Sequence, residues 1–289
     1  MAQLITALLV PFDGQGKLME ESLRQVVEYN ITENKVDGLY VGGSTGENFM
    51  LDTTTKKNIF KIVKEVAADR IELIAQVGSL NIYEAKELAA YVVNELGYQK
   101  ISSVTPFYYK FDFEEIKNYY FEIVKDVEAE LIVYSIPALT GVNFSEDQFG
   151  ELFENPKITG VKYTAGDFYL MERLRSRFPD KLMYSGFDEM LLPAAAVGID
   201  GAIGSTFNVN AKRARQILTA VEGNDLATAR KVQAETNDLI QKILANGLYN
   251  TLKLMLTEKG IDMGYCHLPM KHYTNEQVEV AQELVKEYM

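Results

Sequence analysis

GVKYTAG, residues 160–166, has the composition of a short buried β-strand, except for a lysine at its centre. Successive side chains of a strand point to opposite faces, so Lys162 and Thr164 share one face and Val161 and Tyr163 share the other. An ammonium group on a buried face loses its water, which is unfavourable unless the group is paired or neutralised. The alternative is an edge-strand lysine whose ammonium reaches solvent. Whether Lys162 is buried or lies on an edge strand depends on the fold that the rest of the sequence predicts.

Short apolar runs like this one recur along the first two thirds of the chain, separated by segments with helical periodicity. The runs cover residues 5–10, 38–43, 71–78, 101–106, 131–137, 160–165, 181–186 and 201–205. Such alternation predicts a parallel sheet covered by helices, and eight units are typical of a (β/α)₈ barrel, the TIM barrel. A doubly wound open sheet is the alternative, but no G-x-G-x-x-G follows a strand here.

The last part of the chain has only helical patterns. After residue 210 these cover residues 214–221, 225–247, 248–260 and a last segment from about 274. No low-complexity linker precedes them. We therefore expect one domain over residues 1–289, with an α/β barrel over 1–220 and a C-terminal helical extension over 221–289.

Composition narrows the function classes. The net charge is −12, and no dense Lys/Arg stripe is present, which argues against binding to nucleic acid or to an anionic membrane. No apolar run approaches the roughly 20 residues of a membrane span. The first residues lack a basic signal-peptide region, and the single cysteine excludes an intrachain disulfide, so we expect a cytoplasmic protein.

The only two histidines lie beside that cysteine in CHLPMKH, residues 266–272. Cys266, His267 and His272 lack the paired spacing of a zinc site, so we predict no metal. Acid–base chemistry by histidine is not expected to be central either.

The predicted strand ends carry hydroxyls, glycines and one lysine, and in a barrel function gathers at the carboxyl ends of the strands. GGSTGEN, residues 42–48, places Ser44 and Thr45 in a glycine-flanked turn that suits a small anion such as a carboxylate. It is not a Walker loop, because the G-K-[ST] ending is absent. An ordinary strand-to-helix turn is the alternative interpretation.

Neighbouring parallel strands would place Tyr134 near Lys162. A core tyrosine is the common alternative, but a phenol there could move protons for the adjacent amine. A desolvated lysine has a lowered pKa and a larger fraction of free amine. A free amine attacks a ketone to form a Schiff base, an electron sink for carbon–carbon bond chemistry that needs no metal and no other cofactor.

At this point the motifs resemble a known family. They are GGSTGEN (42–48), TPFYY (105–109), YSIPALTGV (134–142), GVKYTAGDFYLMER (160–173), SGFDE (185–189) and GAIGSTFN (201–208). Together they resemble the N-acetylneuraminate lyases, or sialic acid aldolases, of the pyruvate-dependent class I aldolase superfamily that includes dihydrodipicolinate synthase. The resemblance extends from residue 5 to about residue 260. It implies a (β/α)₈ barrel with three extra helices, a homotetramer, and reversible cleavage of N-acetylneuraminate to N-acetyl-D-mannosamine and pyruvate.

The resemblance also implies roles for individual residues. Lys162 matches the Schiff-base lysine and Tyr134 the proton-transferring tyrosine. Ser44 and Thr45 match the residues that bind the pyruvate carboxylate, and Tyr108 matches a tyrosine that reaches across a subunit interface. The positions that match contacts to the sugar portion are Thr164, Gly186, Asp188, Glu189 and Ser205. The chain after Gly260 matches more weakly, and Cys266 and His267 receive no role.

Three other functions are alternatives for this sequence. Dihydrodipicolinate synthase uses the same lysine, but that branch has an arginine where this chain has Leu139, and leucine cannot hold a carboxylate in a bidentate manner. Aldolases for related 2-keto-3-deoxy sugar acids are a smaller possibility. A barrel that binds sialic acid without turnover would be expected to lack Lys162 or Tyr134. For Asp188 and Glu189, the alternative to binding the sugar is that their carboxylates only cap the helix that follows.

Overall fold

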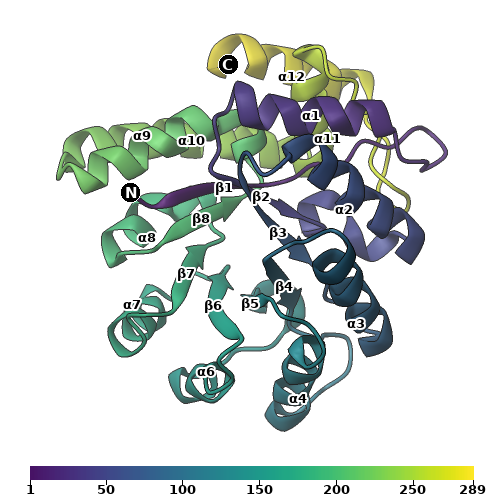
Figure 1. The fold of residues 1–289 in the computed structure, drawn as a ribbon. Coiled ribbons are helices and arrows are strands. Elements are labelled where there is room, and N and C mark those ends of the chain that lie inside the picture. Colours follow the sequence, from purple (N-terminus) through teal and green to yellow (C-terminus); the bar gives the residue numbers. More distant parts are fainter.

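A computed structural model describes all residues, 1–289, and contains eight parallel strands in a closed barrel, so the predicted fold is confirmed. The strands are β1 (Gln3–Ala7), β2 (Gly38–Val41), β3 (Glu72–Gln76), β4 (Lys100–Val104), β5 (Glu130–Ser135), β6 (Ile158–Tyr163), β7 (Leu182–Ser185) and β8 (Gly201–Gly204). Each strand pairs with its neighbour in sequence, and β1 pairs with β8 to close the ring (Figure 1). All eight predicted strands are present, with ends displaced by a few residues.

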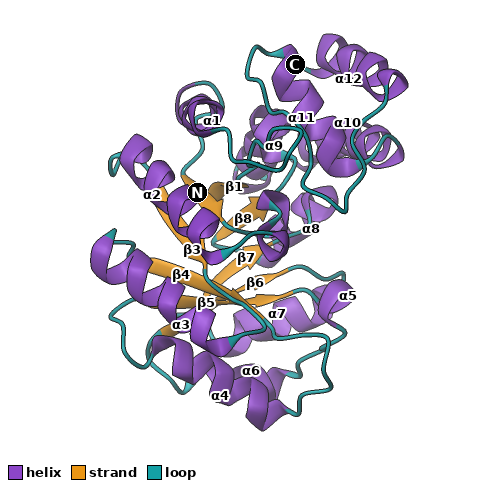
Figure 2. Cartoon of the chain, turned by 90° about the vertical axis from the view of Figure 1, so that its right-hand side faces the viewer, coloured by secondary structure: helices purple, strands orange, loops and turns teal.

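Helices surround the strand ring on the outside (Figures 1 and 2). They are α1 (Glu20–Thr32), α2 (Thr53–Ala67), α3 (Ile82–Ala90), α4 (Phe113–Val124), α5 (Pro137–Thr140), α6 (Glu146–Phe153), α7 (Phe168–Arg177), α8 (Leu191–Val197), α9 (Phe207–Glu222), α10 (Leu226–Ala245), α11 (Leu248–Glu258) and α12 (Asn275–Tyr288). Short 3₁₀ turns cover Ser44–Gly46, Asn48–Met50 and Asp188–Met190, and a π-helical turn, Tyr91–Glu95, ends α3.

The helix ends follow from local side-chain chemistry. The Asp52 carboxylate accepts a hydrogen bond from the Thr55 N–H at the start of α2, and Ser145 forms a reciprocal capping box with Gln148 at the start of α6. Gly198, at φ +93°, ends α8 in the left-handed conformation that glycine adopts most easily. These caps fix where α2 and α6 begin and where α8 ends.

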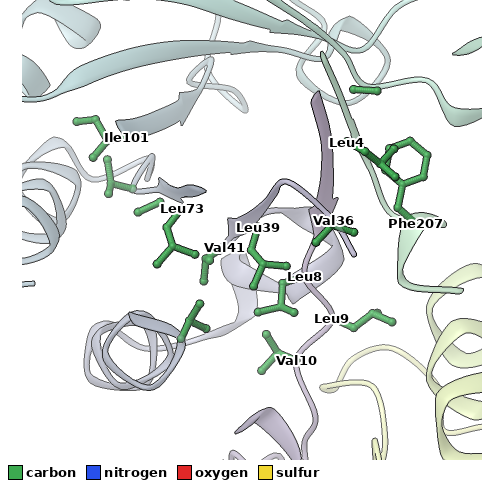
Figure 3. Close-up of a cluster of buried hydrophobic side chains, with 14 of the residues drawn as sticks. Leu4, Leu8, Leu9, Val10, Val36, Leu39, Val41, Leu73, Ile101 and Phe207 are labelled. Atoms are coloured by element: carbon green, nitrogen blue, oxygen red, sulfur yellow. The ribbon is translucent and has the colours of Figure 1, made fainter. Parts of the chain in front are cut away.

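Two buried layers hold the barrel together. Outward-facing strand residues pack against the helices, and Figure 3 shows part of this layer, including Leu39, Val41 and Leu73. A smaller inner cluster fills the barrel. Its buried members are Ile5, Ala7, Tyr40, Ile74, Val104, Ile132, Tyr134, Ile136, Tyr184 and Ile203. Burial of apolar surface in both layers supplies the main favourable term for folding, at about 25 cal/mol per Å².

The C-terminal helices lie beside the barrel. α11 contacts α9, α10 and α12, and in Figure 1 the yellow end of the chain lies next to the purple helix α1. None of the helices combines the length and hydropathy needed to cross a bilayer. The division into residues 1–220 and 221–289 stays a prediction.

Candidate active site

Lys162 lies on the inner face of β6, as the alternation predicted, and its side chain is only 4% exposed. The edge-strand alternative is therefore wrong, because β6 is paired on both sides, with β5 and with β7. The amine lies over two aromatic rings, with Nζ 4.0 Å from the ring centroid of Tyr134 and 4.1 Å from that of Tyr40. The ring faces are the main contacts that the structure gives this group.

Burial dominates the chemistry of this amine. It lowers the pKa of Lys162 from 10.5 to about 7, because the charged form loses hydration, while the Asp188 carboxylate opposes the change. At neutral pH a large fraction of the side chain is then free amine. A buried amine that is partly unprotonated at neutral pH can attack a ketone and form a Schiff base.

Tyr134 is the direct neighbour of Lys162 across the β5–β6 pair, as predicted. The side chain is buried, and burial raises the pKa of its phenol above the usual value. The nearby hydroxyls of Ser44 and Thr164 oppose this rise in the pKa. The phenol is therefore protonated at neutral pH and can donate a proton beside the amine.

The turn after β2 brings Ser44 and Thr45 to the same end of the barrel. Thr45 Oγ1 lies 2.6 Å from Ser205 Oγ, in the turn after β8. Hydrogen bonds inside the turn are donated by the N–H groups of Gly46 and Glu47, to Gly43 and Ser44 carbonyls. The Ser44 and Thr45 N–H groups take no part in these bonds. Hydroxyls and N–H groups gathered at one turn can hold a carboxylate.

Thr164 follows β6 and is buried, and its Oγ1 lies near enough to the Tyr134 phenol to lower the pKa of that phenol but has no partner at good hydrogen-bond geometry. Gly186, after β7, lies directly against it: a Cβ added at Gly186 would overlap Thr164 Oγ1. An orphaned buried hydroxyl is rare in a folded protein, since it forfeits a hydrogen bond. A bound molecule with polar groups would satisfy it.

Asp188 is buried, and its contacts within the chain are to the start of α9, while its predicted contact to the sugar stays a prediction. Its Oδ2 accepts hydrogen bonds from Thr206 N (2.8 Å) and Thr206 Oγ1 (2.6 Å). Burial raises the pKa of Asp188 to about 6, and these two hydrogen bonds oppose the change. Thr206 immediately precedes α9, so the carboxylate satisfies the start of that helix and fixes the turn that carries Ser205.

Two predicted residues lie apart from this cluster. Glu189, one residue beyond Asp188, is half-buried and forms no ion pair. Tyr108 is 82% exposed, at φ +79°, and its ring makes an edge contact with Tyr109. The predicted roles of both residues stay predictions.

Sequence reasoning missed Tyr40. Its ring contacts the Lys162 ammonium. Its hydroxyl donates a hydrogen bond to Ser102 Oγ (3.0 Å), and the Ser102 hydroxyl donates to the Ile132 carbonyl (2.8 Å). The signal was available, because the alternation that places Lys162 inward also places Tyr40 inward in GLYV. The structure contains no cluster of three or more His, Cys, Asp or Glu side chains placed to hold a metal ion.

Comparison with known proteins gives consistent relatives. N-acetylneuraminate lyase from Clostridium perfringens strain 13 is 59% identical over 288 residues, covering 100% of both chains. A solved structure of CdNal from Clostridium difficile in complex with mannosamine is 58% identical, with a TM-score of 0.98, and covers 100% of this chain and 99% of that one. N-acetylneuraminate lyase from Fusobacterium nucleatum complexed with pyruvate is 56% identical, with a TM-score of 0.95, over 100% and 97% of the two chains. The model of the dihydrodipicolinate synthetase family matches residues 1–288, and this chain belongs to that family.

Proposed function

We propose that this chain is a carbon–carbon lyase that cleaves N-acetylneuraminate reversibly to N-acetyl-D-mannosamine and pyruvate, in sialic acid catabolism. The observation that carries the proposal is the Lys162 amine, buried between two tyrosine rings at the barrel mouth. Relatives over the full length, at 56–59% identity, are named N-acetylneuraminate lyase. The family model alone leaves the second substrate open, and the relatives favour the sialic acid.

The proposed reaction begins when the free amine of Lys162 attacks the C2 ketone of the open-chain sugar. Loss of water gives a protonated Schiff base. The C3–C4 bond then breaks, its electron pair moves toward the iminium nitrogen, and the C4 hydroxyl loses its proton as C4 leaves as the aldehyde of N-acetyl-D-mannosamine. The enamine takes a proton at C3, and hydrolysis releases pyruvate and the amine.

Tyr134 is the group placed to move these protons, because it neighbours Lys162 on the next strand and stays protonated at neutral pH. Tyr40 and Tyr134 present ring faces to the nitrogen, and a ring face attracts the positive charge that develops there. The hydroxyls of Ser44 and Thr45 hold the substrate carboxylate in this proposal.

The sugar portion would extend over the turns after β6, β7 and β8. The free Thr164 hydroxyl supports contact with a sugar hydroxyl. Gly186 leaves the space beside it, and Ser205 and Glu189 lie on the neighbouring turns. Asp188 would act mainly by holding Thr206, with its second oxygen left for the substrate.

The dihydrodipicolinate synthase reaction fits less well. Leu139 lies on α5 and is 67% exposed, and its side chain offers no charge to a second carboxylate. The relatives from Clostridium perfringens and Fusobacterium nucleatum are also named as lyases.

Pyruvate and borohydride, followed by peptide mass spectrometry, test the proposal. We expect one reduced pyruvyl group, on Lys162, together with loss of lyase activity. Lys162→Met should remove the label, and the exposed Lys110→Met should retain it. Labelling of another lysine, or of none, would overturn the Schiff-base mechanism. Consumption of N-acetylneuraminate with release of N-acetyl-D-mannosamine tests the substrate separately.

The homotetramer and the cytoplasmic location stay predictions. Exposed aromatic residues support a subunit interface: Phe49 packs edge-on against Phe107, and Tyr108 packs against Tyr109. Sedimentation equilibrium should give four times the mass of the chain, and a monomer mass would contradict the assembly.

A further inference from the structure

Behind the turn that carries Ser44 and Thr45 lies a buried pair of opposite charges. Lys253, on α11, and Glu47, just after that turn, have side chains that are 1% and 0% exposed, and Lys253 Nζ lies 2.5 Å from Glu47 Oε1. No other ion pair in the structure is as deeply buried. We call Glu47 and Lys253 the buried pair.

The buried pair joins the turn to the segment that received no role from the sequence. The second oxygen of Glu47 accepts a hydrogen bond from His267 N (2.5 Å). Lys253 Nζ donates to the Tyr265 carbonyl (2.7 Å) and lies 5.0 Å from the ring centroid of Phe12. Segments that lie far apart in sequence therefore meet at these two charges.

Glu47 also completes the turn through its backbone. Its N–H donates to the Ser44 carbonyl at 3.0 Å and closes the 3₁₀ turn, and its φ of +61° is left-handed, which is uncommon for a residue with a side chain. Surrounding contacts must hold such a conformation in place. The carboxylate supplies that restraint two residues from Thr45, through the ion pair at Oε1, which accepts no hydrogen bond, and through the hydrogen bond at Oε2.

Stability alone does not account for these charges. Replacement of a buried ion pair by apolar side chains of similar volume is often neutral or stabilising, because desolvation offsets the Coulomb attraction. What apolar side chains cannot supply is one ammonium that forms an ion pair with a carboxylate on the turn and donates a hydrogen bond to a carbonyl on the C-terminal segment. This arrangement can hold the turn of Ser44 and Thr45 in a fixed position relative to the C-terminal segment.

We propose that Glu47 and Lys253 are positioning residues for the turn that binds the pyruvate carboxylate, so that α11 and residues 265–267 act on the active site from outside the barrel. The inference rests on the proposed function, in which Ser44 and Thr45 hold that carboxylate. Neither side chain touches the substrate. Tyr249, one helical turn before Lys253, lies near both Glu47 and Tyr134, which places this face of α11 beside the site.

The test is the pyruvate concentration that half-saturates borohydride labelling of Lys162, measured with kcat and KM for N-acetylneuraminate. The variant is Glu47→Gln with Lys253→Met, which leaves no lone buried charge and keeps an acceptor for His267 N. The matched control is Lys242→Met with Glu287→Gln, an exposed pair between α10 and α12. Thermal unfolding and near-ultraviolet circular dichroism verify that each variant is folded.

We expect the half-saturating pyruvate concentration and KM to rise about tenfold or more in the double variant, because small displacements of positioning groups have large effects. The labelling rate at saturating pyruvate should change much less, and the control should match the wild type. Values within twofold of the wild type in the folded double variant would overturn the inference. Failure of the wild type to label would instead overturn the proposed function.

Hydrogen exchange of the wild type gives a measurement that needs no variant. Saturating pyruvate should slow amide exchange in residues 44–48 and in residues 253–267 together, because coupling between two sites is reciprocal. Protection confined to residues 44–48 would overturn the inference.

Discussion

The pH dependence of Schiff-base formation at Lys162 gives the sharpest test of the buried amine. Burial lowers the pKa of this group from 10.5 to about 7. At pH 7 the free-amine fraction is then about one half, against about 0.03% for an ordinary lysine. This difference of roughly a thousandfold is the gain in the fraction of free amine at neutral pH that burial of Lys162 provides.

The expected profile follows from titration of one group. Free amine falls to about 1% at pH 5, so labelling by subsaturating pyruvate should drop about fiftyfold between pH 7 and pH 5. Between pH 7 and pH 9 it should rise by only about twofold, because titration is nearly complete. An ordinary lysine would gain about a hundredfold over those same two units.

Cyanoborohydride labelling from pH 5 to 9, followed by intact-mass spectrometry, measures this profile. Nα-acetyl-lysine in the same solutions corrects for the reagent. Asp188→Asn tests the effect of the Asp188 carboxylate on the lysine. The carboxylate stabilises the Lys162 ammonium, so its removal should lower the pKa of Lys162 and move the fall in labelling to a lower pH. A rate that climbs tenfold per pH unit from 7 to 9 would refute the claim that Lys162 is desolvated.

Three further variants test other parts of the site. Lys162→Met should raise the free energy of unfolding at pH 7 by up to about 4 kcal/mol, because burial lowers the pKa of Lys162 in the folded state and the ammonium is costly to bury. The wild type regains this stability as the pH rises from 7 toward 10.5. Urea unfolding should therefore show a smaller difference in free energy of unfolding between variant and wild type at pH 9 than at pH 7. Tyr134→Phe should lower lyase kcat by about 10²–10⁴-fold while pyruvate still labels Lys162, and unchanged kcat in steady-state assays would exclude it as the proton carrier. Gly186→Ala should reduce kcat/KM by about tenfold or more, because the added methyl group overlaps Thr164. Gly166→Ala is the control, since its methyl group meets only the Phe187 ring at 3.9 Å and should leave kcat/KM unchanged. Equal kinetics for the two alanine variants would contradict a role for the close packing of Gly186 on Thr164.

The barrel and its central pair of residues could be predicted because both follow from local periodicity. Parallel strands keep their register over short distances, so placing Tyr134 and Lys162 on inner faces was enough to bring them together. The short helix α5 and the 3₁₀ turns were not predicted, because so few residues carry no periodic signal. Tyr40 obeyed the same alternation and was missed only because it lacks chemistry of its own.

Contacts between distant segments could not be predicted in the same way. No local pattern pairs Glu47 with Lys253, since a single Glu and a single Lys resemble any of the other charged residues of a chain with 41 acidic and 29 basic groups. Burial distinguishes them, and burial is a property of the closed fold. The segment around Cys266 and His267 had no interpretation for the same reason: its link to the site is the His267 backbone N–H, which no side-chain motif reveals.

Asp188 makes a contact that the sequence did not predict. The sequence placed its carboxylate at the catalytic end of the barrel, and the choice was between binding a sugar and capping the helix that follows it. Its Oδ2 instead accepts both the N–H and the hydroxyl of Thr206, at the start of α9, and the turn between β8 and α9 also carries Ser205, whose hydroxyl meets Thr45. The carboxylate also lies near enough to Lys162 to raise the pKa of that amine. One buried charge therefore links the lysine, the turn that carries Ser44 and Thr45, and the last barrel strand, because a closed barrel brings the ends of β2, β6, β7 and β8 to one place.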